Sequence, residues 1–236
     1  NKKQEKENIE EKIFEEGRKI EDYEKMCKIK KTKIISKKWK NCFPDTYNEL
    51  NYEATIQCSY KLVKDILFEI KQKNITQVEL KSILINQYKL LITNYNLNQE
   101  NLLKIFIAEG KKLENRGVDA SLLLEELILS EEYWLSNIDV WVLLNYFKIN
   151  SVFISPFAIR ETKFKLEEIF IYNDDSVDYL VCIILPSQIK VSISSYKLVV
   201  TENSNIKIPK SQIKMSCFKN IININDSSKI QEYINT

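Results

Sequence analysis

The hydrophobic pattern of this 236-residue chain changes its period near residue 150. Before that point, apolar residues return every three or four positions, as they do on one face of a helix. After it they form short runs or alternate, as they do in strands. Helices followed by strands are typical of α+β proteins. We therefore predict an α+β fold with a helical N-terminal half of five to six helices, followed by a mainly antiparallel sheet of four to five strands.

The same pattern predicts the organisation of the chain. Residues 1–40 are expected to form a charged N-terminal helix and a basic linker, and residues 41–236 a single α+β domain. Within that domain we expect helices over 47–148, strands over 151–201 and a C-terminal helix over 227–235.

Two capping patterns place helix starts within the helical half. Thr76 and Glu79 have the spacing of a capping box, in which side chains bind the free N–H groups of the first turn. Ser136 and Asp139 repeat that spacing before an apolar segment. Each pair predicts the start of a helix.

The first forty residues contain two candidate binding features. Ile9, Ile13, Ile20 and Tyr23 recur at helical spacings and form a narrow apolar stripe. This stripe is either an interaction surface for a protein partner, such as a short coiled-coil seam, or a face that packs on the domain.

A run of lysines follows that stripe. Its candidate nucleic-acid-contacting members are Lys30, Lys31, Lys33, Lys37, Lys38 and Lys40. The alternative is a solvated linker. The net charge of the whole chain is only +2, so there is no overall electrostatic signature of a nucleic-acid-binding protein.

The absence of histidine limits the chemistry that this chain can perform. Neither a Ser-His-Asp triad nor a Cys-His pair can be built within it. The three glycines, Gly17, Gly110 and Gly117, lack the spacing of a phosphate-binding loop. Paired carboxylates remain, but a solvated surface or a turn explains them more simply. We predict no catalytic residues, no metal site and no cofactor.

The five cysteines, at positions 27, 42, 58, 182 and 217, are widely spaced and include no CxxC pair. We therefore expect no disulfide framework and no zinc cluster, but mostly buried thiols in a reducing compartment. The longest apolar run, Tyr179 to Leu185, is too short to cross a membrane. No signal peptide is recognisable, and no membrane partner is expected.

The segment Ser130-Glu-Glu-Tyr-Trp-Leu-Ser-Asn-Ile-Asp-Val-Trp-Val-Leu-Leu-Asn-Tyr-Phe-Lys-Ile-Asn-Ser-Val-Phe-Ile-Ser155 resembles part of the OTU-like cysteine proteases. There a Tyr-Trp pair precedes a helix that leads into a central strand. The segment also resembles parts of large proteins of nucleocytoplasmic large DNA viruses. The abundance of Asn, Ile, Lys and Tyr fits the A/T-rich codon usage of such a source. The similarity covers about 26 residues clearly, and residues 42 to 200 by order of elements.

This resemblance implies an OTU-like layout without activity. The family places a catalytic cysteine at the start of an early helix, a position that Cys42 or Cys58 can occupy here. Its histidine lies on a late strand, and residues 189–201 contain none. The chain is then a pseudoenzyme.

Three functions follow from these observations, in order of preference. The first is a non-catalytic protein-interaction or scaffold domain of a larger viral protein, in the host cytoplasm or the virion interior. The second is an accessory domain of a viral replication or transcription machine that contacts nucleic acid through the lysine run. The third is a cysteine-protease-like enzyme that works without histidine.

Overall fold

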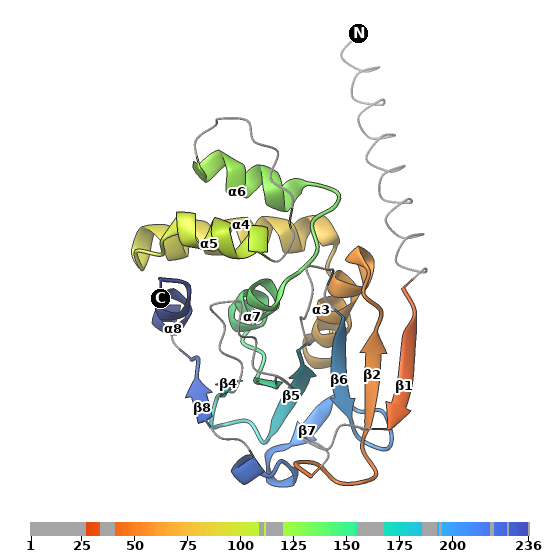
Figure 1. The fold of residues 1–236 in the computed structure, drawn as a ribbon. Coiled ribbons are helices and arrows are strands. Elements are labelled where there is room, and N and C mark those ends of the chain that lie inside the picture. Colours follow the sequence, from red (N-terminus) through yellow and green to blue (C-terminus); the bar gives the residue numbers. More distant parts are fainter. Residues whose placement is uncertain are drawn as a thin grey trace.

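A computed structural model describes residues 27–33, 41–108, 111, 120–154, 168–185, 193, 195–217, 220–225 and 227–235. Its elements confirm the α+β class (Figure 1). The helices are α3 (Ile56–Lys71), α4 (Gln77–Asn94), α5 (Gln99–Ala108), α6 (Ala120–Leu129), α7 (Asn137–Tyr146) and α8 (Ser227–Asn235), with short 3-10 turns η1 (Lys210–Gln212) and η2 (Met215–Cys217). The strands are β1 (Ile29–Lys33), β2 (Asn48–Tyr52), β3 (Ser151–Ile154), β4 (Glu168–Tyr172), β5 (Tyr179–Ile184), β6 (Tyr196–Val200), β7 (Lys207–Pro209) and β8 (Asn220–Asn223).

The sheet is mixed and contains eight strands among the described residues, so the prediction of four to five mainly antiparallel strands is wrong. Its order is β1-β2-β6-β5-β3-β4-β8, and β7 pairs with β5. The β3–β5 and β4–β8 pairs are parallel, and the other pairs are antiparallel. Apolar runs indicate that a segment is a strand, but they do not indicate its partner or direction. Those depend on contacts between segments far apart in the sequence.

Two strands, β1 and β2, come before the first described helix, so the strands do not all follow the helices. The segment expected to begin a helix at residue 47 forms β2, and α3 begins only after Thr55, whose hydroxyl caps the helix. Part of the expected basic linker forms β1, which pairs antiparallel with β2. A five-residue strand next to a long amphipathic helix adds too few apolar positions to alter the helical period. The C-terminal helix lies where it was expected, as α8.

Both faces of the central strands are buried, which explains why these strands are almost continuously apolar. In β5, Val181 and Ile183 pack in the core shared with the helices, whereas Leu180, Cys182 and Ile184 belong to a second apolar cluster on the other face. Cys42, Phe43 and Tyr47, from the segment before β2, and Ile208 and Ile213 also belong to that second cluster.

The helices form layers on one face of the sheet (Figure 1). The helices α3 and α7 lie nearest the strands, and α4, α5 and α6 stack beyond them. The capping box predicted at Thr76 is present, since Glu79 and Thr76 exchange hydrogen bonds. The helix predicted after Ser136 is α7, which is buried along most of its length.

Candidate functional site: a buried polar cluster at the start of α7

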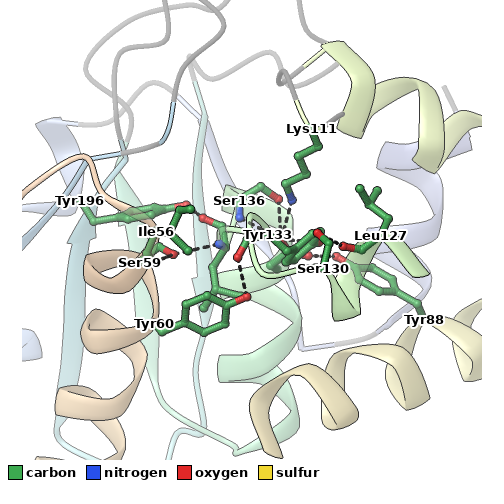
Figure 2. Close-up of polar contacts among 12 residues, drawn as sticks. Ile56, Ser59, Tyr60, Tyr88, Lys111, Leu127, Ser130, Tyr133, Ser136 and Tyr196 are labelled. Atoms are coloured by element: carbon green, nitrogen blue, oxygen red, sulfur yellow. Dashed lines mark hydrogen bonds and ion pairs between the residues drawn. The ribbon is translucent and has the colours of Figure 1, made fainter. Parts of the chain in front are cut away.

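The most densely bonded polar group in the described structure is the carboxylate of Asp139, in the first turn of α7 (Figure 2). One of its oxygens accepts a hydrogen bond from the Tyr88 hydroxyl at 2.5 Å. The other accepts from the Tyr133 hydroxyl at 2.8 Å, from the Ser136 amide at 2.8 Å and from the Ser136 hydroxyl at 3.1 Å. The predicted helix start therefore depends on the same carboxylate that organises its surroundings.

Lys111 supplies the positive charge for this cluster. Its ammonium group lies 2.8 Å from the Asp139 carboxylate, and the side chains of both residues are almost fully buried, with 1% and 0% of their surface exposed. The ammonium also lies 4.0 Å from the ring centre of Tyr133 and 4.1 Å from that of Phe106. Aromatic faces attract cations, so they compensate in part for the loss of water around the lysine. This arrangement satisfies a charge that would otherwise be costly to bury.

The loop before α7, residues 130–136, is held in place by side chains from three other elements, and Figure 2 shows those from α3 and β6. From α3, the Tyr60 hydroxyl donates to the Tyr133 carbonyl at 2.8 Å, and the Ser59 hydroxyl accepts from the Leu135 amide at 2.9 Å. From β6, the Tyr196 hydroxyl donates to the Leu135 carbonyl at 2.9 Å.

The remaining contact comes from α4, where the Lys81 ammonium donates to the Ser130 carbonyl at 2.7 Å. These bonds satisfy backbone groups of an irregular segment that connects α6 to α7.

The titration of these groups follows from their burial. Burial raises the pKa of Tyr60 and of Tyr133 well above the usual tyrosine value, and the nearby Asp139 carboxylate raises both further. Burial also lowers the pKa of Lys81 to about 8. Both tyrosines therefore stay protonated at neutral pH and act as hydrogen-bond donors. The cluster positions backbone and side chains, and its carboxylate is fully engaged within the protein.

One disulfide joins Cys27 and Cys58, whereas the sequence predicted no disulfide framework and mostly buried thiols. Cys58 lies in the first turn of α3 and is fully buried, and Cys27 precedes β1. The bridge therefore links the edge strand to the start of the first described helix. The wide spacing of the cysteines concealed this pair, because they are 31 positions apart and both β1 and β2 lie between them.

The structure also separates the two cysteines proposed for the early helix position. Cys58 lies at a helix start, whereas Cys42 lies in a turn ahead of β2. Burial, followed by the neighbouring Cys217, raises the pKa of the Cys42 thiol to about 12, although Lys214 acts in the opposite direction. A thiol with this pKa is almost entirely protonated at neutral pH and is a poor nucleophile.

Three of the candidate nucleic-acid-contacting lysines lie on β1 at the edge of the sheet. Lys31 and Lys33 share one face of the strand and Lys30 lies on the other, because side chains alternate along a strand. The Lys31 ammonium donates to the Ser204 hydroxyl at 2.7 Å. These three lysines thus form no single basic stripe. Lysines on an edge strand also discourage pairing with other chains.

The other predicted binding residues fall outside the part of the chain that the structure describes. They are Ile9, Ile13, Ile20, Tyr23, Lys37, Lys38 and Lys40.

Among the described residues, no group of three or more Cys, Asp or Glu side chains could hold a metal ion. A cavity of about 350 Å³ lies beside α3, lined by residues that include Lys61, Lys64 and Phe68. Lys61 is already paired with Asp65 at 2.8 Å. This cavity lies on a different part of the structure from the Asp139 cluster, and its lining does not define a reaction.

Comparison with protein-family models, with curated proteins and with solved structures finds no match. In the part of the chain that the structure describes, no helix combines the length and the apolar character needed to cross a lipid bilayer.

The sequence indicated part of this cluster and missed the rest. The Ser136–Asp139 spacing and the Tyr-Trp pair at residues 133–134 were visible in the sequence. Tyr133, Trp134 and Trp141 are buried. Nothing in the sequence singled out Lys111 or Tyr88, which are 28 and 51 residues from Asp139.

Proposed function

We propose that this domain is a non-catalytic protein-interaction or scaffold module, OTU-like in layout, of a larger viral protein. The observation that carries the proposal is the state of the two cysteines that the resemblance singles out. Cys58 has the matching place at a helix start, but its sulfur is bonded to Cys27. Cys42 is buried and protonated. The whole sequence contains no histidine that could activate either thiol.

The arrangement of elements supports the OTU-like layout. The resemblance names an early helix start, the Tyr-Trp segment and a late strand. In this chain those elements are α3, residues 133–134 and β6. Ser59 and Tyr196 bring them together by bonding the same residue, Leu135, through its amide and its carbonyl. The residue that the late strand β6 contributes to this contact is Tyr196.

Thiol reactivity tests the non-catalytic part of the proposal. The full chain is treated with iodoacetamide in its oxidised form and after mild reduction, and alkylation of each cysteine is timed by mass spectrometry. We expect Cys42 and Cys182 to react far more slowly than free glutathione, and Cys58 to stay slow even after reduction because it is buried. The exposed Cys217 serves as the internal positive control. Alkylation of reduced Cys58 faster than free glutathione would support the enzyme hypothesis instead.

Light scattering tests the interaction part of the proposal. The chain of residues 1–236 is compared with one of residues 27–236, which retains β1 and the Cys27–Cys58 bridge. We expect the longer chain to self-associate and the shorter one to be monomeric. The double substitution Ile9→Asp and Ile13→Asp should have the same effect as the truncation, whereas Gln4→Asp and Asn8→Asp, which add the same charge away from the stripe, should not. Equal masses for all four chains would remove the stripe from the proposal.

A further inference from the structure

The thiols of Cys42 and Cys217 lie together at the base of the sheet, on the face opposite the helices. The turn that contains Cys42 and the segment that ends with Cys217 are joined by two hydrogen bonds. The Lys214 amide donates to the Cys42 carbonyl at 2.9 Å, and the Tyr47 hydroxyl donates to the side-chain carbonyl of Gln212. The Cys217 amide donates to the Lys214 carbonyl at 3.1 Å, and the Cys217 side chain is near enough to Cys42 to raise the pKa of its thiol. The two cysteines are therefore neighbours although they are far apart in the sequence.

The two thiols differ in exposure in a way that suits stepwise oxidation. Cys217 is exposed, whereas Cys42 is completely buried in the apolar cluster beneath the sheet. A reagent in solution can reach only the first of them. The fifth cysteine, Cys182, is also buried and lies in the middle of β5. With Cys27 bonded to Cys58, the five cysteines divide into one existing pair, one adjacent pair of thiols and one isolated thiol.

We propose that Cys42 and Cys217 form a second disulfide by exchange with a small-molecule disulfide, of which oxidised glutathione is the test reagent. The Cys217 thiolate attacks one sulfur of the reagent, whose S–S bond breaks and releases one thiolate. Cys42 then loses its proton to solvent, and its thiolate attacks the Cys217 sulfur, which releases the second reagent thiolate. Two protein thiols are oxidised, and one reagent disulfide is reduced to two thiols.

The second step is slow at neutral pH, because the Cys42 side chain is buried and its thiol is almost entirely protonated. We therefore expect a mixed disulfide on Cys217 to accumulate first and then to convert, with the conversion becoming faster by up to about tenfold per pH unit above pH 7. The new bond ties the turn before β2 to the η2 turn before β8. Because it closes a long loop, it should raise the midpoint of thermal unfolding by about 10 °C.

The test is a time course of the full chain with oxidised glutathione, followed by digestion without reduction and peptide mapping by mass spectrometry. The expected product is a Cys42–Cys217 linked peptide that has lost two hydrogens, with Cys182 unmodified. In the Cys42→Ser variant, the glutathione adduct on Cys217 should persist. Three outcomes on the unsubstituted chain would overturn the proposal: a persistent adduct on Cys217, no reaction at Cys217, or a link from Cys217 to Cys27 or Cys58. These readings need no variant, so they hold even if Cys42→Ser fails to fold.

Discussion

Asp139 and Lys111 form a buried ion pair, and replacing Asp139 with asparagine tests what the pair contributes. The substitution removes the negative charge that lies 2.8 Å from the buried Lys111 ammonium. Breaking a buried pair in this way costs about 3–5 kcal/mol of the free energy of unfolding. We expect a loss of that size for Asp139→Asn, measured by urea unfolding.

The matched control is Glu125→Gln, which breaks the exposed ion pair with Lys89, whose ammonium lies 2.7 Å from the carboxylate. Exposed pairs contribute less than about 1 kcal/mol, so this variant should unfold at nearly the urea concentration of the unsubstituted chain. Equal effects of the two substitutions would contradict a special contribution from the Asp139 cluster.

Lys81 gives the cluster a pH dependence of its own. Burial lowers the pKa of Lys81 to about 8, against the effect of Glu131, whereas a lysine in the unfolded chain has a pKa of about 10.4. Between these values the unfolded chain binds more protons at this position than the folded chain, so the contribution of Lys81 to stability rises with pH.

The contribution of the buried thiols to stability falls as the pH rises, because burial raises the pKa of Cys42 and of Cys182 in the folded chain. The measurement is therefore the difference in free energy of unfolding between the unsubstituted chain and Lys81→Met. Relative to Lys81→Met, we expect the free energy of unfolding of the unsubstituted chain to rise by about 1–2 kcal/mol from pH 8 to pH 9.5. A difference that stays constant with pH would show that Lys81 does not titrate in this range.

At the scale of elements, the Cys27–Cys58 bridge attaches the edge strand β1 to the start of α3. Loss of a disulfide that closes a loop of this length costs about 2–4 kcal/mol, mainly because the unfolded chain gains freedom. We expect Cys27→Ser to lower the free energy of unfolding by that amount, and amides of β1 to exchange hydrogen faster than those of the central strand β5.

Reduction provides the control for this prediction. Mild reductant should destabilise the unsubstituted chain by about as much as the substitution does, and it should have little further effect on Cys27→Ser. If the unsubstituted chain loses no stability on reduction, then β1 is held by its pairing with β2 alone.

At the scale of the whole molecule, the described residues are organised around central strands that are buried on both faces. The central strands contribute side chains both to the helix-facing core and to the second cluster, so neither cluster can lose its packing without exposing the other. We expect the chain to unfold in a single cooperative transition.

Two probes test this cooperativity in a Trp39→Phe chain. Tryptophan fluorescence then reports on Trp134 and Trp141, which are buried around α7, and far-ultraviolet circular dichroism reports on all helices and strands. The two urea midpoints should coincide. Separate midpoints would mean that the helical layers and the sheet unfold independently.

Local sequence signals predicted the features that depend on neighbouring residues. The α+β class, the capping pattern at Thr76 and the start of α7 at Ser136 follow from periodicity and from side chains that bond their own backbone. The C-terminal helix was predicted for the same reason. These patterns act within one or two turns of the chain, so the sequence displays them directly.

The tertiary structure decided what depends on distant residues. The spacing of apolar residues does not specify which strands are neighbours. It therefore could not predict the mixed sheet or the incorporation of β1 into it. Lys111 meets Asp139, Cys27 meets Cys58, and Cys42 meets Cys217 only after the chain has folded. A buried charge or thiol has no characteristic local pattern, because its partner is selected by packing. The sequence showed what chemistry the chain lacks, and the fold determined which of the remaining groups come together.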